Sequence, residues 1–300
     1  TFGKAAAGNM YLMLDVGGTE IKAGVLDEHG AIQGGIRHFS SHAKADQEAI
    51  LDHFSMIIKE MAGQWKGVSI DGIGMAFPGP FDYERGISLM QGLDKYDSIY
   101  GISIEEEMKR RTDFIQDTNF CFLHDVEAFA LGESWFGEGR EAGRLLCLCI
   151  GTGTGSAFIE NKRVIKEKTE GVPDHGWIYN LPYRDSIIDD YLSVRGLLKI
   201  SREITGTGLN GKELYERCLE QEEKALLVYQ RFGEELNRCI CPFLDSFHPD
   251  CVVLGGQISK SFPYFGEAFK KECEKRNTTV CLEPETSARA MQGLFVAMSH

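Results

Sequence analysis

Two glycine-rich turns are the features of this sequence whose residue types and spacing could do chemistry. The first lies in Leu14-Asp15-Val16-Gly17-Gly18-Thr19, and the second lies 134 positions later in Leu148-Cys149-Ile150-Gly151-Thr152-Gly153. Glycines let a backbone approach a phosphate closely, and the exposed N–H groups of such turns form nests that bind anions. Both turns are therefore predicted to bind phosphate.

The first turn is preceded by a carboxylate that the second lacks. Asp15 stands where Cys149 stands in the second copy. Mg²⁺ prefers a carboxylate together with phosphate oxygens and water, so Asp15 suits a magnesium ion, and the Thr19 hydroxyl adds a donor. An ordinary glycine-rich hairpin is an equal alternative for either turn alone. The P-loop pattern Gly-x-x-x-x-Gly-Lys-Ser/Thr occurs nowhere in the chain.

Asp125 is the candidate for acid–base chemistry. It follows a predicted strand and opens a predicted helix. There, a carboxylate can accept the proton of a hydroxyl group that attacks a phosphate. The alternative is an N-cap of the helix, which Asp often provides and which the local sequence favours. The two roles are compatible.

Three further groups of residues are weaker candidates. Leu254-Gly255-Gly256 offers a flat glycine surface that could admit a nucleobase. Asp174-His175 and Asp189-Asp190 could line a polyol site, although a solvated loop is the simpler interpretation of both. The cysteine pairs lack a nearby His at the spacing of a structural zinc site, so no zinc site is predicted.

Hydrophobic periodicity arranges these residues in two similar halves. In the first half, strands are predicted at 11–16, 21–26, 31–38, 68–77 and 114–123, and helices at 46–64, 104–111 and 126–136. In the second, strands are predicted at 144–150, 156–159, 251–256 and 279–282, and helices at 187–204, 212–218, 221–247, 259–274 and 287–299. At an offset of 134, Leu14 falls on Leu148 and Ala23 falls on Ala157. The repeat predicts two duplicated α/β domains with a cleft between them.

The bulk composition argues against two classes of partner. The 300 residues carry a formal charge of -13, whereas affinity for nucleic acid needs clustered Lys and Arg. No apolar run reaches the ~18 residues needed to span a bilayer, so no membrane partner is expected. Nine cysteines, several of them within apolar runs, are typical of reduced thiols in a cytoplasmic protein. Residues 1–9 precede Met10 and are expected to lie outside the fold.

Taken together, five motifs resemble those of the ROK family of sugar kinases and sugar-responsive repressors. They are Leu14 to Thr19, Gly74 to Pro80, His124-Asp125, Gly151 to Gly155 and Leu254 to Gly256, in that order. This family belongs to the actin, Hsp70 and hexokinase superfamily. The resemblance implies two duplicated ribonuclease H-like (actin-like ATPase) domains, at 10–125 and 126–300, with an interdomain cleft. It also implies that the last helix packs back on the N-terminal domain.

The resemblance implies roles for these motifs, with ATP and Mg²⁺ as cofactors. It assigns the first phosphate loop to Gly17, Gly18 and Thr19, the second to Gly151, Thr152 and Gly153, and the adenosine wall to Gly255 and Gly256. Asp15 matches the carboxylate on the magnesium side, acting through water. Asp125 matches the general base that activates a sugar hydroxyl for attack on the γ-phosphate.

The departures from the family pattern lie on the sugar side, which the resemblance assigns to Gly79, His124, Asp174, Trp177 and Asp189. His124 replaces the usual Asn, and Asp174 and Trp177 stand at the Glu and His of a Gly-Glu-x-Gly-His element. Asp189, or its neighbour Asp190, matches the Glu that ends the family's zinc-binding cysteine cluster, which is absent here. Zinc-less members with an aromatic residue at the His position resemble the β-glucoside kinase branch. Trp177 is expected either to stack on a sugar ring or to lie in the core.

These observations predict an ATP- and Mg²⁺-dependent kinase that acts on a sugar hydroxyl, most simply the 6-hydroxyl of a hexose, an N-acetylhexosamine or a β-glucoside. The rival hypothesis is a non-catalytic, sugar-sensing protein of the same family without a DNA-binding domain. No winged-helix segment precedes the first strand in this sequence, and the acidic charge also argues against DNA binding. A homodimer is the expectation that comes with the family, and the sequence leaves the identity of the sugar open.

Overall fold

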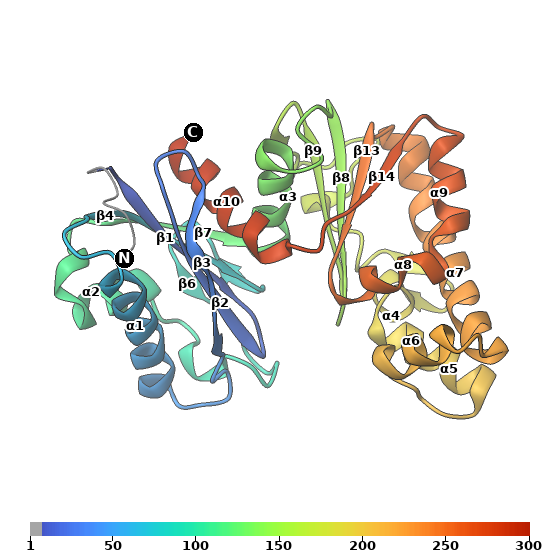
Figure 1. Cartoon of the computed structure of the whole chain (residues 1–300), viewed down its shortest axis with the longest axis horizontal. Coiled ribbons are helices and arrows are strands. Elements are labelled where there is room, and N and C mark those ends of the chain that lie inside the picture. The colour runs from blue at the N-terminus through green and yellow to red at the C-terminus, as the bar shows by residue number, and fades with distance from the viewer. Residues whose placement is uncertain (1–7) are drawn as a thin grey trace. The chain divides into compact units, whose positions relative to one another are not determined.

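The structure is a computed structural model that describes residues 8–300, and the prediction for residues 1–9 therefore falls mostly outside the described residues. The chain divides into two compact units (Figure 1). Of the described residues, unit 1 comprises 8–132 together with Ser287–His300, and unit 2 comprises Glu133–Thr286. No helix in the described part is both long and apolar enough to cross a membrane.

Unit 1 is built on a five-stranded sheet in the order β3-β2-β1-β4-β7. Its strands are β1 (Met10–Val16), β2 (Glu20–Leu26), β3 (Ile32–Ser40), β4 (Ile70–Phe77) and β7 (Asn119–His124). The first three strands form an antiparallel meander, whereas β4 runs parallel to both β1 and β7. The carboxyl ends of β1, β4 and β7 therefore meet at one edge of the sheet.

Strand β1 is sandwiched between helices, and its alternating side chains decide which residues face which helix. Leu12, Leu14 and Val16 share a core with α1 (Gln47–Gly63). The other side chains face α10 (Thr286–Ser299), where the ring of Tyr11 meets that of Phe295 edge-on at 5.2 Å between centroids. Asp15 belongs to this second set, so the alternation directs its carboxylate toward the start of α10.

Two helices cover that second face together. α10 packs so tightly against α3 (Asp125–Phe136) that a Cβ atom on Gly293 would lie 1.7 Å from the Ala128 carbonyl oxygen. A Cβ on Gly132 would likewise lie 1.8 Å from the Arg289 carbonyl oxygen. These glycines let the two helix backbones touch, and the helices run antiparallel there, because Ala128 lies opposite Gly293 and Gly132 lies opposite Arg289.

Unit 2 repeats the sheet of unit 1 in the order β10-β9-β8-β13-β14. Its strands are β8 (Arg144–Ile150), β9 (Thr154–Glu160), β10 (Arg163–Val164), β13 (Cys251–Gly255) and β14 (Thr279–Leu282). Again a three-stranded antiparallel meander is followed by two parallel strands. The predicted duplication is confirmed.

The turn of the first hairpin is one residue longer than that of the second, so the predicted offset of 134 is wrong for the strand that follows the turn. In unit 1 the last pair is Val16 with Ile21, so four residues form the turn. In unit 2 the last pair is Ile150 with Thr154, so three residues form it. The partner of Leu14 is Ala23, whereas the partner of Leu148 is Ser156 rather than Ala157. The offset holds as far as the turn and shifts by one beyond it.

In unit 1, α2 (Ile104–Arg111) packs against α1. The helices that begin in unit 2 cover one face of its sheet, where β8 shares its core with the longest of them, α7. They are α4 (Ile188–Tyr191), α5 (Val194–Thr205), α6 (Gly211–Leu219), α7 (Glu223–Phe247), α8 (Phe262–Phe265) and α9 (Glu267–Glu274). The single helix predicted at 187–204 is wrong, because Ser193 is extended and caps α5 by accepting a hydrogen bond from the Gly196 N–H. The helix predicted at 259–274 is also interrupted, with Pro263 at the start of α8 and Gly266 between α8 and α9.

One predicted strand of unit 1 begins later than its apolar residues indicate. The strand expected at 114–123 starts only at Asn119, because Asp113–Ile115 forms a 3-10 turn that buries Ile115. Three short pairings were not predicted: β5 (Phe81–Asp82) with β6 (Ile87–Ser88), β11 (Pro182–Tyr183) with β12 (Ser186–Ile187), and β10 with β9. Runs of two residues are too short to show a period.

Candidate active site

Asp15 lies at the carboxyl end of β1 and is held by the start of α10. The Ser287 hydroxyl donates a hydrogen bond to Asp15 Oδ2 at 2.7 Å. The pKa of Asp15 is raised to about 6, chiefly by burial, with the Ser287 hydrogen bond acting to lower it and the nearby charge of Asp125 acting to raise it. Lys22, the cross-strand partner of Asp15, lowers it slightly. Asp15 and Asp125 are therefore close enough for their charges to repel each other.

Asp125 opens α3 directly after β7, as predicted, and its carboxylate is available at the surface. Its side chain is 41% exposed. Oδ1 accepts a hydrogen bond from the Val126 N–H at 2.9 Å and lies 3.3 Å from His124 Nδ1. A negative charge in the first turn of a helix is favourable, so a helix-terminal position and a role as base are compatible here.

The predicted sugar-side residues of unit 1 gather beside Asp125. A Cβ on Gly79 would lie 3.7 Å from Tyr83 Oη and 3.9 Å from His124 Cδ2. Tyr83 donates a hydrogen bond to the Phe77 carbonyl at 2.8 Å, and burial, with smaller contributions from the charges of Asp125 and Glu127, raises its pKa. Tyr83 was not predicted, and its only signal is that it follows the Gly-Pro turn by three residues.

The first glycine turn is tied down through its carbonyl groups. Gly17 N–H donates to the Glu20 carbonyl at 3.0 Å, while Tyr96 Oη donates to the Gly17 carbonyl at 2.6 Å. The Ser41 hydroxyl donates to the Gly18 carbonyl at 2.8 Å. Within residues 8–300, the N–H groups of Gly18 and Thr19 have no protein acceptor, and both residues are exposed. This leaves two adjacent donors for an anion.

The second glycine turn is also tied down through its carbonyl groups, by the junction of α4 and α5. Val194 N–H donates to the Gly151 carbonyl at 2.8 Å, and Arg195 Nη1 donates to the Thr152 carbonyl at 2.9 Å. Gly151 N–H itself donates across the turn to the Gly153 carbonyl at 3.0 Å. Sequence reasoning missed Arg195, which lies in what was predicted as one uninterrupted helix.

Asp189 lies against this second turn. Its Oδ1 accepts a hydrogen bond from the Thr154 N–H at 2.7 Å, and a Cβ on Gly153 would lie 2.8 Å from the same oxygen. Arg195 Nη2 donates to Asp189 Oδ2 at 2.9 Å and to Asp190 Oδ1 at 3.1 Å. The structure thus brings Asp189 to the second glycine turn, where the side chain anchors the backbone.

The other two predicted sugar-side residues of unit 2 lie in a partly exposed aromatic group. Trp177 is partly exposed, and its ring centroid lies 4.6 Å from that of His175 and 6.0 Å from that of Tyr179. The side chain of Asp174 is 74% exposed. Ser156 fixes the segment to β9 by donating to the Gly176 carbonyl at 2.7 Å. A fully buried core position for Trp177 is excluded.

β13 ends at Gly255, and Gly256 follows it beside the second turn. Gly256 has a φ of +89°, and a Cβ there would lie 2.5 Å from the Ile150 carbonyl oxygen. Only glycine fits such a conformation and such a close approach. The tight packing puts the residues that follow Gly256 next to the second turn, since Gln257 is the nearest neighbour of a Cβ on Gly151, at 3.8 Å.

A cavity of about 800 Å³ opens directly after this glycine pair. Its wall is apolar on the side of α5, at Val194, Leu197 and Leu198, and cationic at Lys212 and Lys260. The full lining is Val194, Leu197, Leu198, Asn210, Gly211, Lys212, Tyr215, Tyr229, Gln257, Ile258, Lys260 and Ser261. A cavity of this size, with one apolar wall and a few polar groups, suits a small organic ligand such as a nucleoside.

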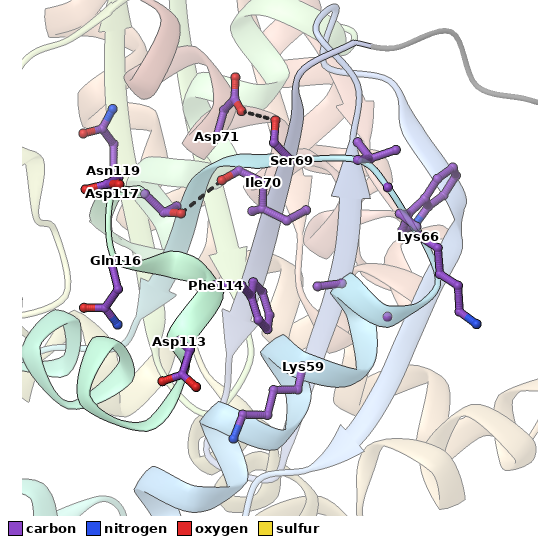
Figure 2. Close-up of a pocket in the computed structure, with 16 residues that line it drawn as sticks. Lys59, Lys66, Ser69, Ile70, Asp71, Asp113, Phe114, Gln116, Asp117 and Asn119 are labelled. Atoms are coloured by element: carbon purple, nitrogen blue, oxygen red, sulfur yellow. Dashed lines mark hydrogen bonds between the residues drawn. The ribbon is translucent and has the colours of Figure 1, made fainter.

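A second cavity, of about 780 Å³, lies at the opposite edge of the unit 1 sheet (Figure 2). It is lined by the amino ends of β4 and β7 and by the 3-10 turn at Asp113, and Ser69 donates to Asp71 on its rim. Asp15 and Asp125 lie at the carboxyl ends of their strands. This cavity therefore has no part in the candidate active site.

No group of three or more His, Cys, Asp or Glu side chains is arranged to hold a metal ion anywhere in residues 8–300. A divalent cation at this edge of unit 1 would draw few ligands from the protein. Asp15 is the side chain best placed for it, since its carboxylate stands beside a turn that presents free N–H donors. Such a donor set fits Mg²⁺, which keeps several waters and binds through one or two carboxylates plus phosphate oxygens.

Comparison with known sequences identifies a family with this arrangement. The sequence model of the ROK family matches residues 11–292. The chain is 25% identical over 283 residues to an N-acetyl-D-glucosamine kinase of Haemophilus influenzae, and the match covers 87% of this chain and 88% of that relative.

Comparison with solved structures gives the same fold. A ROK family glucokinase from Streptomyces griseus, in complex with glucose and AMPPNP, matches 96% of this chain and 98% of its own, with a TM-score of 0.71 and 18% identity. A ROK family transcriptional regulator, a homologue of the E. coli MLC protein, matches 97% of this chain and 78% of its own, with a TM-score of 0.78 and 16% identity. The predicted actin-like ATPase fold is confirmed. Because a kinase and a regulator share it, the residues of the site must distinguish them.

Proposed function

This chain belongs to the ROK family, and on that premise we propose that it transfers the γ-phosphoryl group of ATP to a sugar hydroxyl. One observation carries the proposal beyond the fold: two carboxylates, Asp15 and Asp125, meet at one edge of the unit 1 sheet, beside a turn with free N–H donors. A protein that only senses a sugar needs neither a base at the sugar nor a phosphate-binding turn.

We assign the proton transfer to Asp125. Transfer breaks the bond between the γ-phosphorus and the β–γ bridging oxygen and forms a bond between that phosphorus and the sugar oxygen. The hydroxyl proton passes to the carboxylate of Asp125, which is 41% exposed and therefore reachable by a substrate. Positioning and electrostatic stabilisation supply most of the catalysis in phosphoryl transfer, so the base needs only correct placement.

We assign the nucleotide to groups in both units. The N–H groups of Gly18 and Thr19 and the carboxylate of Asp15 would serve its terminal phosphates, with Asp15 holding Mg²⁺ through water. The ion neutralises phosphate charge when it is bound. The turn at Gly151 would bind phosphate as well, and the cavity after Gly256 would receive the adenosine. The Streptomyces griseus relative, crystallised with AMPPNP, supports the choice of ATP.

We assign the sugar to Asp125, His124 and Gly79 in unit 1 and to Trp177 and Asp174 in unit 2. An exposed aromatic face suits the apolar side of a pyranose ring. Relatives named glucokinase and N-acetyl-D-glucosamine kinase support a hexose or an N-acetylhexosamine, and the zinc-less sequence adds β-glucosides to the candidates. The 6-hydroxyl is the acceptor we favour. ATP dependence and the acidic composition support a cytoplasmic location.

The test is ADP release by the wild-type protein with Mg²⁺-ATP and a panel of hexoses, N-acetylhexosamines and β-glucosides. We expect turnover with at least one sugar and a loss of about 1,000-fold in kcat for Asp125→Asn. Asp113→Asn makes the same chemical change at the opposite edge of the sheet and serves as the control. If no sugar supports ADP release, the kinase proposal fails; if Asp125→Asn stays within tenfold of wild type, Asp125 is not the base.

The rival function is a non-catalytic sugar sensor. It is favoured by the likeness to a transcriptional regulator and by the substitutions His124, Asp174 and Trp177. Calorimetry separates the two proposals, because a sensor binds a sugar of the panel without releasing ADP. Sugar binding accompanied by ADP release excludes it.

A further inference from the structure

Lys95 lies on the first glycine turn, although it comes from a loop far along the chain. A Cβ on Gly18 would lie 3.3 Å from Lys95 Cδ, so the lysine stem covers the Cα of Gly18. Gly18 and its neighbour Thr19 carry the two N–H groups that have no acceptor within the described residues. A cationic side chain therefore accompanies the donors that face a bound anion.

The loop that carries Lys95 is fixed to the turn. Tyr96 is fully buried, its hydroxyl donates to the Gly17 carbonyl at 2.6 Å, and its N–H donates to the Ala43 carbonyl at 2.7 Å. Asp94 and Tyr96 both have a φ of 57°, a left-handed conformation that is uncommon for a residue as bulky as tyrosine. Such conformations persist where the surroundings over-determine them, and they concentrate at functional sites.

The ammonium group of Lys95 has no ion-pair partner in the described part of the chain. Across residues 8–300, no carboxylate lies within ion-pair distance of its ammonium group, although the neighbouring Asp94 pairs with Lys44 at 2.7 Å. Lys22, the other lysine beside this turn, acts on Asp15, whose pKa it lowers. Lys95 is only partly exposed, so it lies against the turn rather than extending into solvent.

We propose that Lys95 binds the terminal phosphate of the nucleotide and stabilises the charge that develops on it during transfer. This rests on the proposed kinase function. Unit 1 holds the base for the acceptor hydroxyl, so the phosphate that meets unit 1 is the one that is transferred. An ammonium group on a flexible stem suits a phosphate that changes position as its bond to ADP breaks.

The experiment compares Lys95→Met with Lys44→Met. Lys44→Met removes the same charge from the same region, but the side chain of Lys44 is 73% exposed and forms an ion pair with Asp94. We expect Lys95→Met to lower kcat/KM for ATP about 100-fold and Lys44→Met to change it less than about threefold. Lys95→Arg, which keeps the charge, should recover at least about a tenth of wild-type activity. Melting temperatures within about 2 °C of wild type establish that the variants are folded.

Equilibrium binding supplies the readout that a structural role would not move. By calorimetry with Mg²⁺, Lys95→Met should bind ATP about tenfold more weakly, while its affinity for ADP changes less than about threefold. Equal losses for ATP and ADP, or behaviour indistinguishable from that of Lys44→Met, would overturn the assignment to the terminal phosphate.

The same binding data separate this proposal from the kinase proposal. If the wild type releases no ADP with any sugar, yet loses affinity for ATP and not for ADP when Lys95 is replaced, the phosphate contact stands and the kinase proposal fails. If the wild type turns over and Lys95→Met matches it, the kinase proposal stands and this one fails. If the wild type binds neither nucleotide, both fail.

Discussion

The two glycine hairpins begin from the same position in the same sheet order and have diverged in what they bring to it. Both hold their turn through its carbonyl groups, by hydroxyls of Ser41 and Tyr96 in one and by Val194 and Arg195 in the other. The first brings Lys95, which has no ion-pair partner within residues 8–300, and Asp15, whose charged form is disfavoured by burial. In the second, the nearby charges neutralise one another in ion pairs. The two copies therefore share the way in which hydrogen bonds hold the turn, but they differ in the charged side chains that lie beside it.

The strongest test of this electrostatic difference is to replace the residue at the position where the two hairpins differ, Asp15 in the first and Cys149 in the second. Asp15→Asn should lower kcat/KM by about 1,000-fold, because an amide cannot hold Mg²⁺ as a carboxylate does. Cys149→Ser, at the matching position, should stay within about threefold of wild type. Steady-state ADP release measures both, and sugar binding by the Asn variant controls for folding. An Asn variant within tenfold of wild type would show that the two hairpins are electrostatically equivalent.

The anchor of the second hairpin gives the next largest effect. Arg195→Met removes a support of the turn, and Asp189→Asn breaks the ion pair that holds Arg195 against it, so KM for ATP should rise about tenfold to thirtyfold with a smaller change in kcat. Tyr96→Phe removes one support of the first turn and is the matched variant. The resemblance assigned Asp189 to the sugar. If Asp189→Asn raises KM for the sugar and leaves KM for ATP unchanged, the sugar assignment holds and the anchoring role fails.

The pH dependence of the free energy of unfolding tests the difference between Asp15 and Cys149 without any assay of activity. The pKa of Asp15 is raised from 3.8 to about 6, so its charged form destabilises the fold above about pH 6 and has no effect below about pH 4. In EDTA, Asp15→Asn should therefore raise the free energy of unfolding by about 2 kcal/mol at pH 8 and by almost nothing at pH 3.5. Urea titrations of Asp15→Asn and Cys149→Ser measure this. A gain equal at both pH values would contradict it.

The smallest expected effect concerns the first glycine of each turn. A Cβ on Gly17 would lie 2.8 Å from the Glu20 carbonyl oxygen, which is backbone and cannot move without breaking the turn. A Cβ on Gly151 would make an ordinary contact with Gln257 at 3.8 Å. Gly17→Ala should lower the free energy of unfolding by about 1–2 kcal/mol, and Gly151→Ala by less than about 0.5 kcal/mol. Thermal or urea unfolding distinguishes them, and equal losses would refute the steric argument.

The sequence predicted what depends on local pattern. The apolar runs that form β1 and β8, the glycine turns and the start of α3 at Asp125 are all encoded within a few residues, and each was found where expected. The duplication was also visible, although the offset of 134 failed beyond the turn. A turn of three residues, Gly-Thr-Gly, and a turn of four, Gly-Gly-Thr-Glu, look alike because both begin with Gly and contain a second Gly and a Thr.

The contacts that complete the site were not predictable in this way. Ser287 lies 272 positions from the Asp15 that it binds, and neither residue carries a local signal of the other. Lys95 reaches Gly18 only because Tyr96 fixes its loop, and Asp189 reaches Thr154 only because α4 ends before α5 begins. Each depends on how distant elements pack, which no periodicity within one element reveals.

The return of α10 to unit 1 has a consequence for protein synthesis. A ribosome makes the strands of unit 1 first, then all of unit 2, and makes Ser287 and the rest of α10 afterwards. Until then β1 lacks the helix that covers one of its faces, and Asp15 lacks the hydroxyl that binds it. Unit 2 is continuous in sequence and has its own core, so it can fold before α10 has been synthesised. The candidate active site is thus completed only after the strands of both sheets have been translated.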